Sequence, residues 1–372
     1  MFHCSKLFTC FWCGWKTGKQ SHGKDVLKRK TIFSIKLSLP FFDRLLPGMG
    51  VIFFLLMATH LFAQEERAGG FFSLRSQSPI QQLRVGIQHH LPWTVPEKHW
   101  ALHFQYTWKN MWLYDEGLFR VDGEVLEWVF RSAYGITDRW EVMAEIPVRY
   151  LTGGILDGLI EWFHDTFGYS QAGREKYPRN QFAVEIYVPE TDTRFRLDAS
   201  EVGWQLGNLV FSTTYALTKT RNQKFRAVLT GNIKFPTATT QHLFGSQNID
   251  LGCSLGMGYD LTPLHIYYNA GFLYYGDKEV MGILLRQWHL SMLLAFEYRK
   301  SGSRHSWIFQ GLVESGVAVD YNEFAKRTSE ILLGYKHYYQ SGWTFGIGIL
   351  ENIFYYDNSP DVALHLELTR IF

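Results

Sequence analysis

The sequence has few charged residues and no long apolar run. Charged side chains make up 19% of its 372 residues, whereas about 25% is usual in soluble proteins. A membrane-spanning helix needs about 20 consecutive, mostly apolar residues, and the longest apolar stretches here are shorter. The sequence therefore argues against a helical membrane protein.

Cysteine is also scarce. The chain has four, and three of them (Cys4, Cys10 and Cys13) lie near the amino terminus. Cys10 and Cys13 form a CxxC pair, but a zinc site would need a second pair, which is missing. Residues 1–48 carry a net charge of +7, so the rest of this +2 chain carries −5. We therefore expect no nucleic-acid partner, no cofactor and no metal.

The amino terminus has the pattern of an export signal. Residues 49–63 contain a short apolar run, residues 51–58, that follows Arg44, and cleavage is expected after Ala63, as in a secretory signal peptide. We expect residues 1–48 to be a mis-annotated or discarded leader. After cleavage, residues 64–98 would form an amino-terminal periplasmic or plug segment, and residues 99–372 the main domain.

Aromatic residues are abundant instead. Phe, Tyr and Trp make up 17% of the chain, yet the mean hydropathy is only −0.13. Such a composition excludes intrinsic disorder, which needs few aromatic residues and many charges. It indicates that apolar and polar residues are finely interleaved.

The interleaving has a period of two residues, which is typical of half-exposed strands. In one stretch Trp100, Leu102 and Phe104 alternate with polar residues such as His103 and Gln105. Such segments exceed the usual five or six residues of a soluble strand, and a membrane strand needs about 9–11. Twelve segments follow the pattern: about 99–112, 118–135, 139–151, 200–217, 222–236, 247–261, 263–276, 285–300, 304–320, 327–340, 342–355 and 361–372.

These features predict an all-β fold, a transmembrane antiparallel β-barrel of about twelve strands. Aromatic residues at the ends of the apolar stripes would form the interfacial girdles of such a barrel. The small residues Gly252, Gly256 and Gly258 on one inner face suit a tight lumen or a closely approaching plug. The charges expected to face the lumen are Glu127, Arg131, Glu141, Glu145, Arg226, Glu297 and Glu314.

The connections between the segments alternate in length. If both ends of the barrel-forming chain lie in the periplasm, the periplasmic connections are short and the extracellular ones mostly long, as in outer-membrane barrels. The last segment ends in Phe372 and carries Leu366 and Leu368 on the same face. A terminal Phe on a closing strand resembles the signal read by the barrel assembly machinery, although Arg370 departs from that pattern.

Several motifs are similar to those of an uncharacterised family of outer-membrane proteins, a domain of unknown function. They include the stretch 74–79, Arg131 with Tyr134 and Gly135, and the stretch 145–147. The most distinctive motif runs from Gly153 to Gly168 and is followed by Gly173 and Arg174. The resemblance covers residues about 71–372. It implies a barrel in the Gram-negative outer membrane and no known activity. The export signal leads us to expect that the chain reaches this membrane after Sec-type export.

The longest connection, residues 152–199, differs from the rest. Residues 155–167 have helical spacing, with Leu156, Leu159, Ile160, Phe163 and Phe167 on one face. The opposite face carries acidic residues and a histidine, which could bind a substrate or cation above the barrel mouth with two nearby arginines. The alternative is the solvated face of a helix that caps the barrel. The predicted substrate-binding residues are Asp157, Glu161, His164, Arg149 and Arg174. Residues 181–196 predict a β-hairpin broken at Pro189.

Three hypotheses on function follow. The first is a small-solute channel or transporter, and the second is a closed barrel with a structural or adhesive role. The third is a lipid-modifying enzyme that uses Ser291 and His289 with Asn269, although these residues should face the lumen rather than lipid. We therefore expect no catalytic residues. The expected partners are outer-membrane lipid and lipopolysaccharide, the barrel assembly machinery and periplasmic chaperones.

Overall fold

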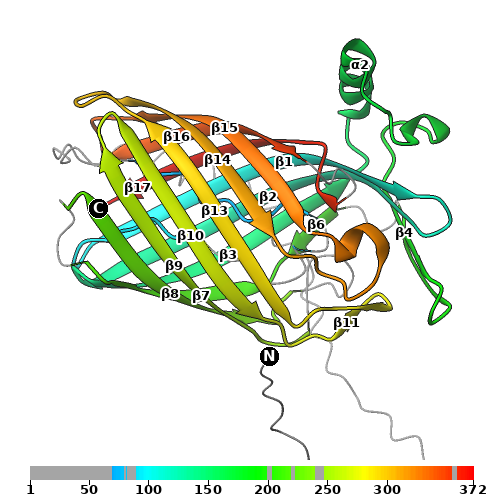
Figure 1. The fold of residues 1–372 in the computed structure, drawn as a ribbon, viewed down its shortest axis with the longest axis horizontal. Helices are drawn as coiled ribbons and strands as arrows, with labels where there is room; N and C mark the ends of the chain where they lie inside the picture. The colour runs from blue at the N-terminus through cyan, green and yellow to red at the C-terminus, as the bar shows by residue number, and fades with distance from the viewer. Residues whose placement is uncertain are drawn as a thin grey trace, which may run out of the picture. The chain divides into compact units, whose positions relative to one another are not determined.

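The chain folds into a closed antiparallel barrel (Figure 1). The computed structural model describes residues 69–78, 81, 89–198, 203–218, 223–238, 247–353 and 358–372. The expected leader (1–48) and signal peptide (49–63) lie outside these residues. The described residues contribute twelve strands to the barrel, which confirms the predicted fold class. These strands are β1 Trp100–Asp115, β2 Phe119–Thr137, β3 Trp140–Thr152, β7 Leu209–Ala216, β8 Phe225–Phe235, β9 Asp250–Leu261, β10 Leu264–Tyr274, β13 Trp288–Tyr298, β14 His305–Glu314, β15 Thr328–Tyr338, β16 Trp343–Asn352 and β17 Val362–Ile371.

The first and last strands close the barrel. β1 pairs with β2 on one side and with β17 on the other, with Phe104 opposite Leu368 and Tyr106 opposite Leu366. The backbone N–H of Trp100 donates to the carbonyl of Phe372 (2.8 Å), and the N–H of Phe372 donates to the carbonyl of Trp100 (2.9 Å). Pairing of β1 with β17 leaves neither edge strand of the sheet with unpaired backbone groups. This pairing stabilises the barrel, because each unpaired backbone group in hydrocarbon costs several kcal/mol.

The two ends of the barrel differ in their connections. At the short-turn end the strands are joined by residues 138–139, 217–224, 262–263, 299–304 and 339–342. At the long-loop end they are joined by residues 116–118, 153–208, 236–249, 275–287, 315–327 and 353–361. The long loops carry the remaining elements: α2 Asp157–Phe167, η3 Arg174–Lys176, β4 Ala183–Val188, β5 Thr193–Leu197, β6 Gly203–Leu206, β11 Glu279–Val280, β12 Ile283–Leu284 and η5 Asn322–Ala325.

Two strands near the long-loop end change partners along their length. β2 pairs with β3 over residues 124–137 and with β4 over residues 119–122. β3 pairs with β7 over residues 140–145 and with β6 over residues 148–151. The predicted segment 200–217 is therefore two strands rather than one. The predicted helix and the hairpin within residues 181–196 are both present, as α2 and β4–β5.

Two other loops differ from the prediction. The predicted strand 304–320 ends at Glu314, because Val317 and Ala318 turn inward and become buried. The predicted loop 277–284 contains the hairpin of β11 and β12. No helix formed by the described residues has the length and apolar character that a membrane crossing requires.

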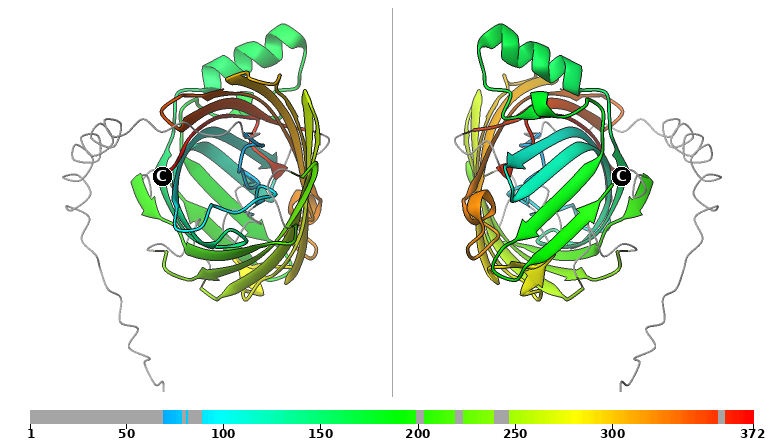
Figure 2. Two further views of the ribbon diagram at one scale, coloured as in Figure 1. Left: turned by 90° about the vertical axis from the view of Figure 1, so that its left-hand side faces the viewer. Right: turned by 90° about the vertical axis from the view of Figure 1, so that its right-hand side faces the viewer.

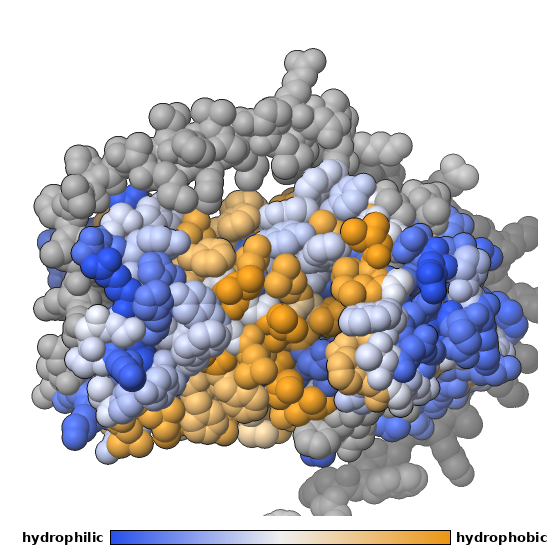
Figure 3. Space-filling view, turned by 90° about the horizontal axis from the view of Figure 1, so that it is seen from above, coloured by the Kyte–Doolittle hydropathy of each residue, from blue (hydrophilic) through white to orange (hydrophobic). Residues whose placement is uncertain are grey.

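The outer wall of the barrel is apolar. Residues that would be core in a soluble protein are exposed there, for example Leu290 at 57% and Ile349 at 57%. The apolar surface forms a band between hydrophilic ends (Figure 3). Aromatic residues lie at both borders of the band, with Trp100, Trp140 and Trp307 toward the short-turn end and Trp128, Trp204 and Trp288 toward the long-loop end. This is the arrangement of a lipid-facing belt with two aromatic girdles.

The closed barrel predicts heat-modifiable migration. The unboiled protein should migrate faster in SDS gel electrophoresis than the boiled protein, because a fully paired barrel stays compact until heat breaks the sheet. The boiled sample is the control. Equal migration of the two samples would contradict a closed, lipid-facing barrel.

Candidate functional site

A segment of the chain's own amino-terminal part runs inside the barrel (Figure 2). We call its described residues, 69–78, 81 and 89–99, the inner segment. The inner wall makes room for it with glycine. A Cβ atom at Gly256 would lie 2.9 Å from the carbonyl oxygen of His90, and one at Gly258 would lie 2.5 Å from Pro92 Cγ. A Cβ at Gly334 would lie 2.2 Å from the ring of Phe72. The wall is therefore shaped to fit the inner segment.

Wall side chains also bind the backbone of the inner segment. The N–H of Phe72 donates to Gln310 Oε1 (2.9 Å), and the N–H of Gln77 donates to Glu330 Oε1 (3.0 Å). Nearer the short-turn end, the N–H of Val95 donates to Glu141 Oε2 (2.6 Å). These residues of the inner segment are neither helix nor strand, and buried N–H groups need partners. The wall supplies those partners at several points along the segment.

Arg75 of the inner segment lies between two wall carboxylates. Its guanidinium is 3.4 Å from Glu127 and 3.5 Å from Glu145. Glu145 also pairs with Arg131 at 2.5 Å, and Glu127 also pairs with Arg149. All five side chains are buried. Removing one member of a buried ion pair typically costs about 3–5 kcal/mol, because the other charge is left without compensation.

The seven predicted lumen charges all lie on the inner wall and are buried. They bind one another, other wall residues or the inner segment. Glu297 accepts hydrogen bonds from the hydroxyls of Tyr267 (2.8 Å) and Tyr338 (3.0 Å) and from the backbone of Gly70 (2.9 Å). Arg226 pairs with Asp260 at 2.5 Å. The lumen is thus an extended network of charged and polar contacts.

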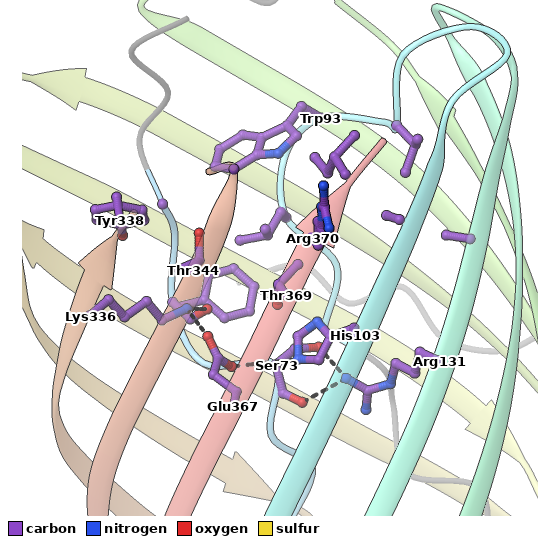
Figure 4. Close-up of a pocket in the computed structure, with 18 of the residues that line it drawn as sticks. Ser73, Trp93, His103, Arg131, Lys336, Tyr338, Thr344, Glu367, Thr369 and Arg370 are labelled. Carbon is purple, nitrogen blue, oxygen red and sulfur yellow. Dashed lines mark hydrogen bonds and ion pairs between the residues drawn. The ribbon is translucent and has the colours of Figure 1, made fainter. Parts of the chain in front are cut away.

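A cavity of about 610 Å³ lies between the inner segment and the wall at the short-turn end (Figure 4). Lys336 and Glu367 pair on one side of it, and His103 Nε2 is 3.6 Å from Glu367. Lys336 Nζ also donates to the carbonyl of Phe71 (2.8 Å). The cavity is more cationic than anionic. Two carboxylates, Glu141 and Glu367, line it together with five cationic side chains: Arg131, Arg299, Arg304, Lys336 and Arg370.

The long-loop end is closed by a different kind of contact. An apolar cluster connects β2 with the loops beside β13 and β14, which lie across the barrel from β2. The ring centroids of Phe119 and Phe324 are 4.9 Å apart. Burial raises the pKa of Tyr321 to about 12, and its hydroxyl donates to the carbonyl of Tyr187 (2.7 Å). We call this set the mouth cluster: Met111, Leu113, Phe119, Val121, Val125, Leu151, Phe182, Val184, Ile186, Val188, Leu197, Ile283, Leu285, Val317, Ala318, Tyr321 and Phe324.

The structure brings together only part of the predicted substrate site. Asp157 Oδ1 accepts a hydrogen bond from Arg174 (2.6 Å), and both residues are buried. Glu161 instead pairs with Arg179, at 2.5 Å. Arg149 is separate from this group, because it projects into the lumen and pairs with Glu127. That these residues bind a substrate stays a prediction.

The contacts around Asp157 hold the loop against the barrel strands. Arg174 also pairs with Asp361 (2.7 Å). Burial raises the pKa of the Asp361 carboxyl, and the adjacent Arg174 opposes that shift. His164 lies on the same side of α2, and its Nδ1 has no hydrogen-bond partner. The described residues contain no cluster of three or more metal-ligating side chains that could hold an ion.

Ser291 and His289 bind the same carboxylate rather than each other. Ser291 Oγ donates to Glu314 Oε1 (3.0 Å), and His289 Nε2 lies 3.2 Å from Glu314 Oε2. Both residues are at most 1% exposed on the inner wall. Asn269 accepts a hydrogen bond from the backbone of His90 (3.2 Å). His289 is therefore not the base of Ser291, and the histidine that contacts Ser291 Oγ is His89 of the inner segment, with its Nε2 at 3.2 Å. This pair is buried in the lumen and does not face lipid, as the site of a lipid hydrolase would have to.

Several lumen residues were missed by the sequence analysis. Glu330 and Lys336 occupy even positions of β15, and His365 and Glu367 occupy odd positions of β17, which are the inward positions of those strands. The same period-two alternation that identified the other lumen charges would have found them. Arg75 had no such signal, because the inner segment has no regular period.

Comparisons with known proteins identify a family and a fold. A family model described as a protein of unknown function matches residues 51–372. The structure is similar to an outer membrane channel from Pseudomonas putida F1, with a TM-score of 0.50 and 12% identity over 75% of this chain and 97% of that one. At this identity, the likeness shows the fold alone.

Two further solved structures are less similar. The NanC porin has a TM-score of 0.41 and 9% identity, over 73% of this chain and 98% of that one. The toluene transporter TodX of Pseudomonas putida has a TM-score of 0.35 and 10% identity, over 81% and 98%. No curated protein sequence matches the chain significantly.

The fit of the inner segment predicts the effect of filling a wall glycine. Gly334→Leu should displace Phe72 and lower stability by about 1–3 kcal/mol, as overpacking does. Trypsin cleavage after the buried Arg75 should then become roughly tenfold faster, since about 1.4 kcal/mol corresponds to that factor. Gly311→Leu is the matched control, because a Cβ at Gly311 meets nothing within 4 Å. Equal cleavage of the two variants would contradict a close fit at Gly334.

Proposed function

This chain belongs to the DUF3187 family, whose function is unknown, and we propose that it is an outer-membrane channel for a small anionic solute. The short-turn end would face the periplasm and the long-loop end the exterior, as in other outer-membrane barrels. The observation that carries the proposal is the cavity of about 610 Å³ at the short-turn end, with its excess of cationic side chains. The carboxyl-terminal strand with Phe372 would serve as the assembly signal.

The electrostatics of the cavity favour an anion. A cleft with low-dielectric walls and charges of one sign raises the local concentration of the opposite charge. Arg304 is exposed at the rim of this cavity, where it adds to the positive potential. Deeper in the cavity, Lys336 is held by Glu367 and by the carbonyl of Phe71. The fixed inner segment would then narrow the path and select solutes by size.

The mouth cluster would be the gate of this channel. Its contacts are mostly apolar, and several members lie in loops rather than in the wall. Residues 317–324 and 283–285 reach across the opening from one side, and movement of these loops would uncover the lumen. Function often resides in such loops on a rigid scaffold.

The second candidate is a closed barrel with a structural or adhesive role. The inner segment and the mouth cluster together favour it, because they occupy the lumen and one opening. A lipid hydrolase is a weaker candidate, since Ser291 and His289 are buried and both bind Glu314. Conductance measurements separate a channel from a closed barrel.

Neutralising cations of the cavity should weaken anion preference. In planar bilayers with a KCl gradient, the wild-type protein should give a reversal potential of the sign expected for chloride. The double variant Arg304→Gln and Arg370→Gln should shift that potential toward zero, because it removes two of the five cations that line the cavity. Arg139→Gln is the control, since Arg139 lies in a turn at the same end but outside the cavity lining. A cation-selective wild-type protein would contradict the proposed solute class.

Loosening the mouth cluster should increase conductance. Phe324→Ala removes a fully buried ring, a change that typically costs about 3–5 kcal/mol of packing, so the loops should open more often. Val319→Ala in the same loop is the control, because Val319 is 50% exposed. Single-channel recordings should show more frequent openings for Phe324→Ala alone. If neither the wild-type protein nor Phe324→Ala conducts, the protein is a closed barrel.

A further inference from the structure

Helix α2 turns most of its apolar residues outward, while Asp157, Glu161 and the apolar Ile160 lie on the side toward the protein. Asp157 and Ile160 are only 3% and 4% exposed. The exposed apolar residues of the helix and its flanks are Ile155, Leu159, Trp162, Phe163, Phe167 and Tyr169, all between 41% and 72% exposed. A surface helix in water has the opposite arrangement, with its apolar stripe facing the core.

The acidic face is occupied by contacts within the protein. Asp157 accepts hydrogen bonds from Arg174 (2.6 Å), from Asn110 (3.1 Å) and from the backbone N–H of Asn180 (2.6 Å). Glu161 pairs with Arg179. These bonds fix the rotation of the helix about its own axis. Contacts within the protein therefore determine that the apolar stripe points outward.

The helix begins beside the aromatic girdle of the barrel. The backbone N–H groups of Ile155 and Leu156 both donate to Glu124 Oε1 (2.6 Å each). The other oxygen of Glu124 accepts a hydrogen bond from the indole N–H of Trp108 (2.5 Å). Trp108 lies on β1 one alternation beyond Tyr106, whose ring packs against Trp128 of the girdle at 5.3 Å. Glu124 thus joins the start of α2 to the border of the lipid-facing belt.

The position of the helix also fits a membrane surface. α2 lies outside the barrel wall at the long-loop end (Figures 1 and 2). Its axis runs across the barrel axis rather than along it, which is parallel to the membrane plane. Helices with an apolar face that includes Trp, Phe and Leu lie in such planes, with that face buried at the boundary of headgroups and acyl chains.

We propose that α2 is an in-plane anchor whose apolar face inserts into the acyl-chain boundary of the outer leaflet. The proposal rests on the membrane location in the proposed function, but not on solute passage. The partner is lipid, because α2 begins at the border of the lipid-facing belt and exposes its apolar stripe there. The anchor would hold the loop of residues 153–182 down on the outer wall, beside the mouth.

Depth-dependent quenching tests the anchor in the intact protein. Cys4, Cys10, Cys13 and Cys253 are replaced by Ser, and bimane is attached at Trp162→Cys. The protein is then reconstituted in phosphatidylcholine vesicles with or without bromine on the acyl chains. Bimane at position 162 should be quenched several-fold more by brominated lipid than bimane at Glu190→Cys. Glu190 is the control, since it is exposed at the tip of the β4–β5 hairpin.

Each outcome decides the proposal. Strong quenching at position 162 and weak quenching at position 190 supports the anchor. Equal, weak quenching at both positions overturns it, as does disulfide crosslinking of unlabelled Trp162→Cys between copies, which would mean that the stripe binds a second chain. Conductance is recorded on the same sample, so a protein that does not conduct but is quenched would contradict the channel and leave the anchor intact.

Discussion

The charged side chains buried on the inner wall need ion-pair or hydrogen-bond partners, and the inner segment supplies many of them. Glu127 and Glu145 face Arg75, and Glu141 and Glu330 accept backbone N–H groups of the same segment. Each of these contacts offsets part of the free energy that it costs to remove a carboxylate from water. The glycines of the wall leave the space that the inner segment occupies, so the wall and the segment also fit each other in shape. The barrel and its inner segment therefore form a single folded unit rather than a tube with a removable filling.

The same reversal of polarity governs both the barrel and helix α2. In a soluble protein, apolar residues gather inside and charges face water. Here the barrel holds its charges inside and exposes Leu290 and Ile349, and α2 buries Asp157 while exposing Trp162. A hydrocarbon surrounding accounts for the arrangement of the barrel and, if α2 lies in the membrane as proposed, for that of the helix, because hydrocarbon favours outward apolar surface and disfavours outward charge. The water-exposed parts are the two ends, where the surface becomes hydrophilic (Figure 3).

The sequence was sufficient for the barrel but not for its interior. Period-two alternation located all twelve strands and placed charges such as Glu127 and Arg226 on the inner wall, because parity in a strand fixes the face. It could not find the contacts of Arg75, since the inner segment has no regular period. The alternation also predicted that the strand 304–320 continues through Val317 and Val319. Alternating apolar residues give the same pattern whether they form a paired strand or a loop that folds into the mouth. Helical spacing placed Asp157 and Glu161 on one side of α2, yet it cannot tell which side of a helix faces the protein.

The inner segment and the mouth cluster are held by interactions of different kinds, and this difference favours the mouth as the part that would open in the proposed channel. The inner segment is held by directional hydrogen bonds and ion pairs that would have to break together, with every freed charge left in a dry interior. The mouth cluster is held mainly by dispersion and apolar burial, which yield gradually as a loop moves. Local opening draws on the parts of a structure with the lowest stability, and these are commonly loops. In the proposed channel, the loop that carries Phe324 would therefore be the part that moves, and the inner segment would be the fixed element that narrows the path of the solute.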